Sequence, residues 1–226
     1  MAYTTMKQLM DQYRSYAKAQ NWEAAHDTLL YGVDCGHLPA RLELARLYKE
    51  CPFLGMPLKE RYAKAQYHYR SLQNLMDPEL SARAMAVISM EMAELYACMH
   101  RPVGHLAMLL RAKRLGADVP ERDVQHARRL MRDMDIRDFG QSAQDALDLG
   151  IELSLSGSGA RLTELLLREA SESENPAIRG EAALALADFY LERKNESIVY
   201  LHEAHRSYHR AAEAGYPEYF SRRNAV

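Results

Sequence analysis

The sequence predicts an all-α protein built from repeated helix pairs, and three observations support this prediction. The 226 residues include only 8 Pro and 11 Gly and are rich in helix-forming types, which disfavours a sheet-rich fold. A pattern of an apolar residue, Ala, a charged residue, an apolar residue and Tyr occurs three times, as LARLY at 44–48, MAELY at 92–96 and LADFY at 186–190. Prolines that follow amphipathic segments recur at about forty residues, at Pro39, Pro78, Pro120, Pro176 and Pro217, with about fifteen extra residues after Pro120.

These spacings divide the chain into five repeats. Ala45 and Ala93 are 48 residues apart and Ala93 and Ala187 are 94 apart, so a degenerate copy is expected between the last two, with ALDLG at 146–150 as the candidate. A first-turn proline costs a helix no hydrogen bond and therefore indicates where a helix begins. We predict a single helical-repeat domain over 1–226, with repeats at about 1–38, 39–77, 78–119, 120–175 and 176–216 and a C-terminal cap at 217–226.

Apolar residues within the repeats recur at three and four positions, as in helices that bury one face. Ile178, Ala182 and Leu186 form one such stripe. Proline and glycine signals separate the helices, and SGSG at 156–159 predicts a tight turn. The expected helices are 3–19, 22–35, 39–50, 59–76, 79–99, 103–116, 121–134, 141–155, 160–173, 177–193 and 197–214. The segments CGHLP, MDP, LGADVP, SGSG, ENP and AGYP, in this order along the chain, mark boundaries between them.

Two further segments carry a recognisable pattern. The residues concerned are Tyr62, Lys64, Ala65, Tyr69 and Arg70 in RYAKAQYHYRSLQ at 61–73, and Ala204, Tyr208, Arg210, Ala211, Ala212 and Gly215 in YLHEAHRSYHRAAEAG at 200–215. They resemble the second helix of Sel-one-like repeats, a branch of the tetratricopeptide superfamily. The three Tyr-containing pentapeptides are similar to the first-helix signature Leu-Gly-x-Leu-Tyr of that family, with Ala in place of Gly, and the first repeat agrees through Trp22, Ala25 and Gly36.

The resemblance implies a right-handed α-solenoid of about five antiparallel helix pairs that recognises other proteins. The loop ECPFLGMPL at 50–58 is longer than the family turn, and 121–140 has no clear place in the pattern. Independently of the family, small residues such as Ala45 let helices approach closely, and the following tyrosine covers the gap against the neighbouring repeat. A stack of such pairs curves and offers a concave surface.

If the first helices line a groove, as the resemblance implies, polar positions next to the signature alanines face it. Arg46, Glu94 and Asp188 follow these alanines directly, and Lys49 lies one turn after Arg46. By the same reasoning Arg128 and Arg132 contribute to the groove. We predict that these six residues contact a partner protein or peptide.

The loop CPFLGMP at 51–57 places the large apolar residues Phe53, Leu54 and Met56 in a turn. Loops are normally exposed. The loop therefore either folds back onto a neighbouring helix pair or forms a hydrophobic contact with a partner or with a second copy of the chain in a homodimer.

Three histidines occur at helical spacing near the C-terminus. His202, His205 and His209 could hold a metal ion only if other ligands completed the site. His202 and His209 are about 10 Å apart along a helix at 1.5 Å per residue. We therefore expect no metal site here, with a solvated helix face as the preferred interpretation and metal binding as the alternative.

Charge and motifs limit the other function classes. The chain has 29 Lys and Arg against 31 Asp and Glu, which argues against a membrane or nucleic-acid binder that depends on net charge. The stretch 101–137 has nine basic and five acidic residues, and nucleic-acid binding through it is an alternative, although ion pairing between repeats is preferred. Without a nucleophile elbow, a phosphate-binding glycine loop or a zinc-protease motif, neither an enzyme nor a cofactor is expected.

Cysteine usage and hydropathy suggest the compartment. Cys35, Cys51 and Cys98 are an odd number without a close pair, which favours a reducing environment. No stretch of about 18 apolar residues suggests a membrane span. We expect a cytoplasmic protein, and an effector exported without a signal peptide would have the same features. The predicted function is that of a non-catalytic adaptor, scaffold or regulatory chaperone.

Overall fold

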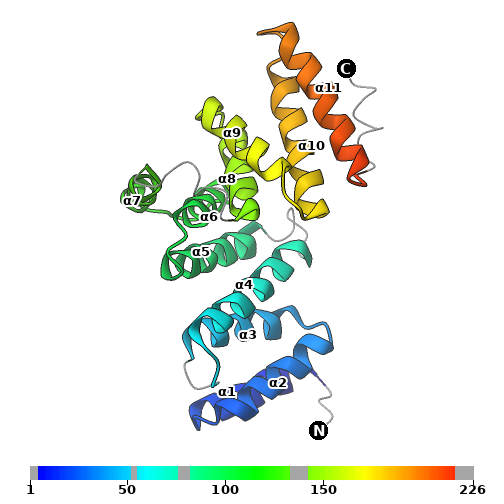
Figure 1. Ribbon diagram of the computed structural model, residues 1–226. Coiled ribbons are helices and arrows are strands. Elements are labelled where there is room, and N and C mark those ends of the chain that lie inside the picture. The colour runs from blue at the N-terminus through cyan, green and yellow to red at the C-terminus, as the bar shows by residue number, and fades with distance from the viewer. Residues whose placement is uncertain (1–4, 52–54, 76–81, 133–141, 217–226) are drawn as a thin grey trace. The chain divides into compact units, whose positions relative to one another are not determined.

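The computed structural model describes residues 5–51, 55–75, 82–132 and 142–216, and all regular secondary structure within these ranges is α-helical (Figure 1). This confirms the all-α prediction. The helices are α1 Met6–Lys18, α2 Trp22–Asp34, α3 Leu38–Glu50, α4 Leu58–Leu75, α5 Ala82–Cys98, α6 Pro102–Arg114, α7 Glu121–Arg132, α8 Ala143–Leu155, α9 Ala160–Ser171, α10 Pro176–Glu192 and α11 Ile198–Glu213.

Five of the described helices begin after a polar side chain that caps the first turn. The side chains of Thr5, Asn21, Ser142 and Ser197 accept hydrogen bonds from backbone N–H groups two or three residues later. Asn175 does the same before Pro176, which is the first residue of α10. These caps satisfy backbone donors that the helix itself leaves unpaired, which explains why helix starts were predictable to within a few residues.

Several helices end at a glycine with left-handed backbone geometry. Gly36 follows α2 with φ of 79°, and Gly116 follows α6 with φ of 90°. L-residues rarely adopt this conformation, so glycine stops a helix at low cost. The expected helix 103–116 therefore ends earlier, at Arg114.

The chain divides into two compact units. The first unit comprises Met1–His100 and Leu115–Ala117, and the second comprises Arg101–Arg114 and Asp118–Val226. The boundary falls within the expected repeat 78–119, and the single-domain assignment stays a prediction.

In the first unit, consecutive helices from α1 to α5 pack against one another (Figure 1). Two signature tyrosines are buried in this packing. The Tyr48 hydroxyl lies 2.8 Å from His26 Nε2 on α2, and the Tyr96 hydroxyl accepts a hydrogen bond of 2.6 Å from Arg70 on α4. Each tyrosine thus contacts the helix that precedes its own, as the repeat pattern predicted.

In the second unit, α6 contacts α7 and α8, and the chain continues through contacts of α8 with α9, α9 with α10 and α10 with α11. The third signature tyrosine, Tyr190, repeats the arrangement. Its hydroxyl donates to Glu164 at 2.8 Å and accepts from Arg168 at 2.8 Å, both on the preceding helix α9. Recurrence of one contact at three signature positions makes the fold repeat-like.

The degenerate copy ALDLG lies on α8 and packs in a different way. Gly150 occupies the position of the signature tyrosine, and a Cβ atom there would lie 2.7 Å from Leu167 Cδ2 on α9. A contact below 3.0 Å forces a shift in a packed core. The glycine therefore allows α8 and α9 to approach closely where the other copies use a tyrosine.

A buried histidine is part of the core of the first unit. His68 on α4 stacks on Tyr48 with ring centroids 5.7 Å apart, and its side chain is 8% exposed. Its Nδ1 atom has no hydrogen-bond partner among the described residues. Burial, followed by the nearby charges of Arg41, His26 and Lys64, lowers the pKa of His68 to about 4.

We expect acid to destabilise the first unit through His68. The pKa is about 4 in the folded protein and about 6.5 in an unfolded chain. The stability due to neutral His68 is therefore present above pH 6.5 and is lost as the pH falls towards 4, by about 2 to 3 kcal/mol. Urea unfolding of wild type and His68→Phe between pH 7.5 and pH 4 would measure it, because phenylalanine keeps the stack without titrating. Equal pH dependence of the two proteins would contradict the assignment, and His202→Phe, at an exposed position, is the control.

The described residues also bear on the predictions for membrane spans, for the cysteines and for the loop at 51–57. No helix in the described ranges is both long enough and apolar enough to span a membrane. Cys35 and Cys98 are exposed free thiols, and Cys51 is a buried one. Phe53, Leu54 and the predicted cap 217–226 lie outside the described residues, and the described Met56 is half-buried.

Candidate functional site

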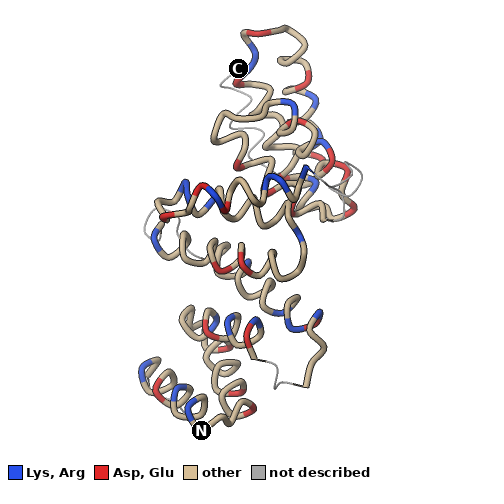
Figure 2. Tube along the Cα trace, turned by 90° about the vertical axis from the view of Figure 1, so that its left-hand side faces the viewer, with Lys and Arg blue, Asp and Glu red and all other residues tan. Residues whose placement is uncertain are grey.

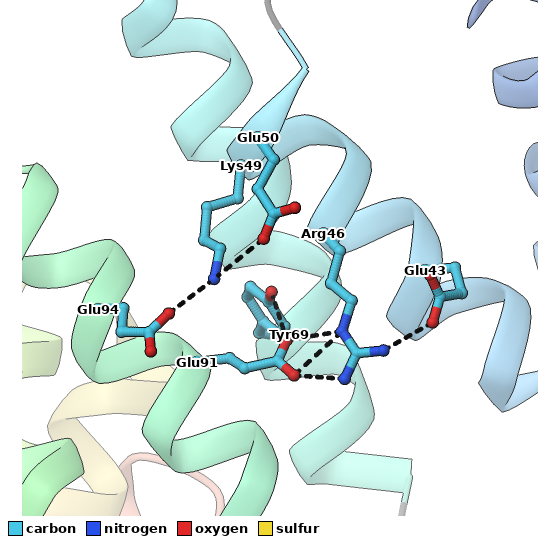
Figure 3. Close-up of polar contacts among 7 residues, drawn as sticks. All are labelled: Glu43, Arg46, Lys49, Glu50, Tyr69, Glu91 and Glu94. Carbon is cyan, nitrogen blue, oxygen red and sulfur yellow. Dashed lines mark hydrogen bonds and ion pairs between the residues drawn. The ribbon is translucent and has the colours of Figure 1, made fainter. Parts of the chain in front are cut away.

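Three of the predicted partner-binding residues lie together in the first unit. Arg46 and Lys49 lie on α3 and Glu94 lies on α5. Figure 3 shows them within one group of polar side chains from α3, α4 and α5, which we call the α3–α5 ion cluster. Its members are Glu43, Arg46, Lys49, Glu50, Tyr69, Glu91 and Glu94.

Arg46 is the centre of this cluster. Its Nε atom lies 3.0 Å from each carboxylate oxygen of Glu91, and its Nη2 atom also pairs with Glu91. Its Nη1 atom donates to Glu43 at 2.6 Å. The Tyr69 hydroxyl donates to Glu91 at 2.8 Å, so the carboxylate is held from two helices. A guanidinium that is bonded on both edges acts as a fixed part of the surface.

Lys49 and Glu94 form a second ion pair, in which the carboxylate is exposed. Lys49 Nζ lies 2.9 Å from Glu94 and 3.6 Å from Glu50. The Glu94 side chain is 64% exposed, unlike that of Glu91, which is 15% exposed. The Lys49 side chain is only 12% exposed, so Glu94 is the accessible partner of a largely buried ammonium group.

The local field keeps Arg46 charged and Tyr69 neutral. The hydrogen bonds to Glu91 raise the pKa of Arg46 above its ordinary value. Burial, and then the Glu91 carboxylate, raise the pKa of Tyr69 strongly. With four carboxylates and two cations, the cluster has an excess of negative charge, so it favours cationic over anionic groups.

Sequence reasoning missed Glu91, Glu43 and Tyr69, on which the position of Arg46 depends. The signal that could have identified the pairs is their spacing: Arg46 and Glu91 are 45 residues apart, and so are Lys49 and Glu94. That separation is one helical turn shorter than the 48 residues between the signature alanines Ala45 and Ala93. Opposite charges at this offset therefore indicate pairing between first helices of successive repeats.

A hollow lies on α5 beside Glu91, and we call it the α5 hollow. It has a volume of about 600 Å³. Its lining is mainly small and apolar, and Val87 is 45% exposed in it. The lining residues are Ala82, Arg83, Ala86, Val87, Met90, Glu91 and the turn 115–117. An apolar hollow with charged side chains at its edge is typical of a site that takes an apolar side chain of a ligand.

The other three predicted residues lie in the second unit. Asp188 on α10 accepts a hydrogen bond of 2.6 Å from the Tyr208 hydroxyl on α11, so this carboxylate contributes to helix packing. Arg128 and Arg132 lie on α7, with Arg132 exposed and Arg128 half-buried. Their assignment to a partner-binding face stays a prediction.

The basic stretch 101–137 supplies ion pairs within the second unit. Arg101 pairs with Asp145 at 2.9 Å and Arg114 with Glu152 at 2.8 Å, and both acids are buried on α8. Lys113 pairs with Glu121 at 2.8 Å. Figure 2 shows basic and acidic positions interspersed along the helices. Ion pairing between repeats was the preferred interpretation of this stretch, and these contacts agree with it. Basic side chains that are held in such pairs are less available to bind a nucleic acid.

The second unit also has a polar hollow of about 330 Å³ between α9, α10 and α11. Three arginines line it, and each has an acidic partner. Arg168 pairs with Glu164, Arg206 with Glu203 and Arg210 with Glu172. The balanced charges indicate no particular ligand.

The three histidines lie on the exposed side of α11. His202, His205 and His209 are all exposed, whereas Ala204 and Tyr208 on the same helix are buried. His209 Nδ1 lies 3.2 Å from Glu213. Within the described part of the chain, no group of three or more His, Cys, Asp or Glu side chains is arranged to hold a metal ion.

Comparison with known proteins identifies no match to this chain. No family model matches the chain, and neither a curated protein nor a solved structure does so.

Proposed function

We propose that this protein is a polypeptide-binding module, a non-catalytic adaptor, scaffold or regulatory chaperone. In this proposal the helices form a right-handed α-solenoid of about five antiparallel pairs, as the resemblance to Sel-one-like and tetratricopeptide repeats implies. A segment of a partner protein binds to the first helices of successive pairs.

The α5 hollow is the observation that carries the proposal. It offers about 600 Å³ next to the α3–α5 ion cluster, so one surface combines an apolar pocket with charged groups that can bind a peptide. Binding sites on proteins commonly pair an apolar anchor pocket with a few polar groups that orient the ligand. In this proposal Arg46, Lys49 and Glu94, which belong to the neighbouring α3–α5 ion cluster, contact the partner segment.

The test is a random dodecapeptide library displayed on phage and panned against the full-length protein. We expect selected peptides to bind with micromolar Kd, measured by fluorescence anisotropy. Val87→Glu, which places a charge in the α5 hollow, should weaken this binding at least about tenfold, equivalent to 1.4 kcal/mol. Ala97→Glu is the matched control, because it adds the same charge at an exposed position of α5 outside the lining of the hollow.

Two outcomes would contradict the proposal. One is that the library yields no binding peptide, or yields peptides that bind Val87→Glu as tightly as wild type. The other is a homodimer, detected by analytical ultracentrifugation, that Val87→Glu dissociates, because the hollow would then belong to an interface between two copies of the chain.

A further inference from the structure

A second hollow in the first unit has a different chemistry. It has a volume of about 290 Å³ and lies on α1, α2 and α3, and we call it the α1–α3 hollow. Its lining residues are Tyr13, Ala17, Trp22, Glu43, Arg46, Leu47, Glu50 and Cys51. Glu43 and Arg46 belong also to the α3–α5 ion cluster, so the hollow borders that surface.

Two aromatic side chains and two carboxylates line this hollow. Tyr13 and Trp22 come from α1 and α2, whereas Glu43 and Glu50 are seven residues apart on α3 and thus lie on one face of it. Aromatic ring faces and carboxylates both attract cations, and the attraction of a ring is strongest for tryptophan. Ala17 and Leu47 add apolar surface against which the aliphatic part of a long side chain can pack.

The charge of the lining is negative. Glu43 and Glu50 outnumber the single lining cation, Arg46, which is already bonded to Glu91 and Glu43. Burial, followed by the carboxylates of Glu43 and Glu50, raises the pKa of Tyr13. The Glu50 side chain is largely exposed and its contact with Lys49 is long, at 3.6 Å. Glu50 is therefore available to an incoming cation, and an anionic group would be repelled.

We propose that the α1–α3 hollow binds a lysine or arginine side chain of the partner segment. The inference rests on the proposed function, because it names the kind of residue that the bound segment carries. The aliphatic stem packs on Ala17 and Leu47, and the charged head is stabilised by the aromatic rings and by Glu50. A segment that carries both a basic and an apolar residue then fits the two hollows of the first unit.

Trp22 provides a direct measurement, because it is the one tryptophan in the chain and it lines the hollow. Intrinsic fluorescence of the full-length protein is titrated with an acetylated, amidated pentapeptide that has a central lysine flanked by leucines. Peptides with norleucine or glutamate at the centre are the matched probes. We expect a saturable change in Trp22 emission and about tenfold tighter binding of the lysine peptide than of the norleucine peptide.

Two variants link this preference to the hollow. Glu50→Gln should reduce the advantage of lysine over norleucine to about threefold or less, because the neutral amide removes the charge that the head contacts. Glu60→Gln also removes an exposed carboxylate of the first unit, but on α4 and outside the lining, and it should keep the full preference.

Equal binding of the lysine and norleucine peptides, or an unchanged preference in Glu50→Gln, would overturn this inference. The proposed function would survive either result, because the phage selection and Val87→Glu test a different hollow. Absence of any Trp22 response also overturns the inference, and the library experiment then decides the proposed function independently.

Discussion

Replacing Arg114 with methionine is expected to lower the free energy of unfolding of the second unit by about 3 kcal/mol. The guanidinium donates two hydrogen bonds of 2.8 Å to Glu152, one to each carboxylate oxygen. The Glu152 side chain is only 4% exposed. Without Arg114 this carboxylate would remain away from water and without its partner, and burial of an uncompensated charge is among the costliest changes in a protein.

Urea unfolding followed by circular dichroism measures this effect. The double variant Arg114→Met/Glu152→Met should recover most of the lost stability, because it removes both charges and leaves apolar side chains in their place. Arg122→Met is the control, because Arg122 is highly exposed on α7 and its contact with the neighbouring Asp123 is 3.4 Å long. If Arg114→Met and Arg122→Met were equally stable, the contact of Arg114 with the buried Glu152 would have no structural role.

Replacing Arg46 with methionine is expected to cost the first unit about 2 kcal/mol. Glu91 would lose both sides of its guanidinium contact and keep only the hydrogen bond from the Tyr69 hydroxyl, and Glu43 would lose its bond to Nη1. The expected loss is smaller than for Arg114, because Glu91 retains one donor and is 15% exposed.

The same unfolding measurement tests this prediction, with Lys49→Met as the matched control. Lys49→Met removes the neighbouring cation of the cluster, whose partners Glu94 and Glu50 are exposed, and should change stability by less than about 1 kcal/mol. Equal losses for the two variants would contradict a central role of Arg46. The result also bears on binding experiments, since a change at Arg46 that unfolds the unit cannot be interpreted as loss of a partner contact.

Much of the helical framework could be predicted from local signals. The helix starts at Asn21, Asn175 and Ser197 are capped by their own side chains, and Gly36 and Gly116 end helices because they adopt left-handed geometry. These effects depend on residues a few positions apart, so they can be read without knowledge of the tertiary structure. The apolar periodicity likewise identified the buried faces, including that of Ala182 and Leu186 on α10.

The candidate site was predictable only in part. Its position followed from the repeat, because the residues after the signature alanines, Arg46 and Glu94, do lie in one cluster. What each side chain does there was not predictable from its position. Arg46 is held by Glu91 and Tyr69, and Asp188 accepts a bond from Tyr208, so residues expected to face a partner are also bonded within the protein.

The sequence by itself determined the helices, their spacing and the recurrence of Tyr48, Tyr96 and Tyr190 at equivalent positions, because these follow from local capping and from apolar periodicity. Only the tertiary structure decided which charges are paired, which acids of α8 are buried and where the α5 and α1–α3 hollows lie. Ion pairs such as Arg46 with Glu91 and Arg114 with Glu152 join residues about forty positions apart. Their partners are chosen by the packing of one helix against another, and the energy of each pair depends on how far that packing excludes water.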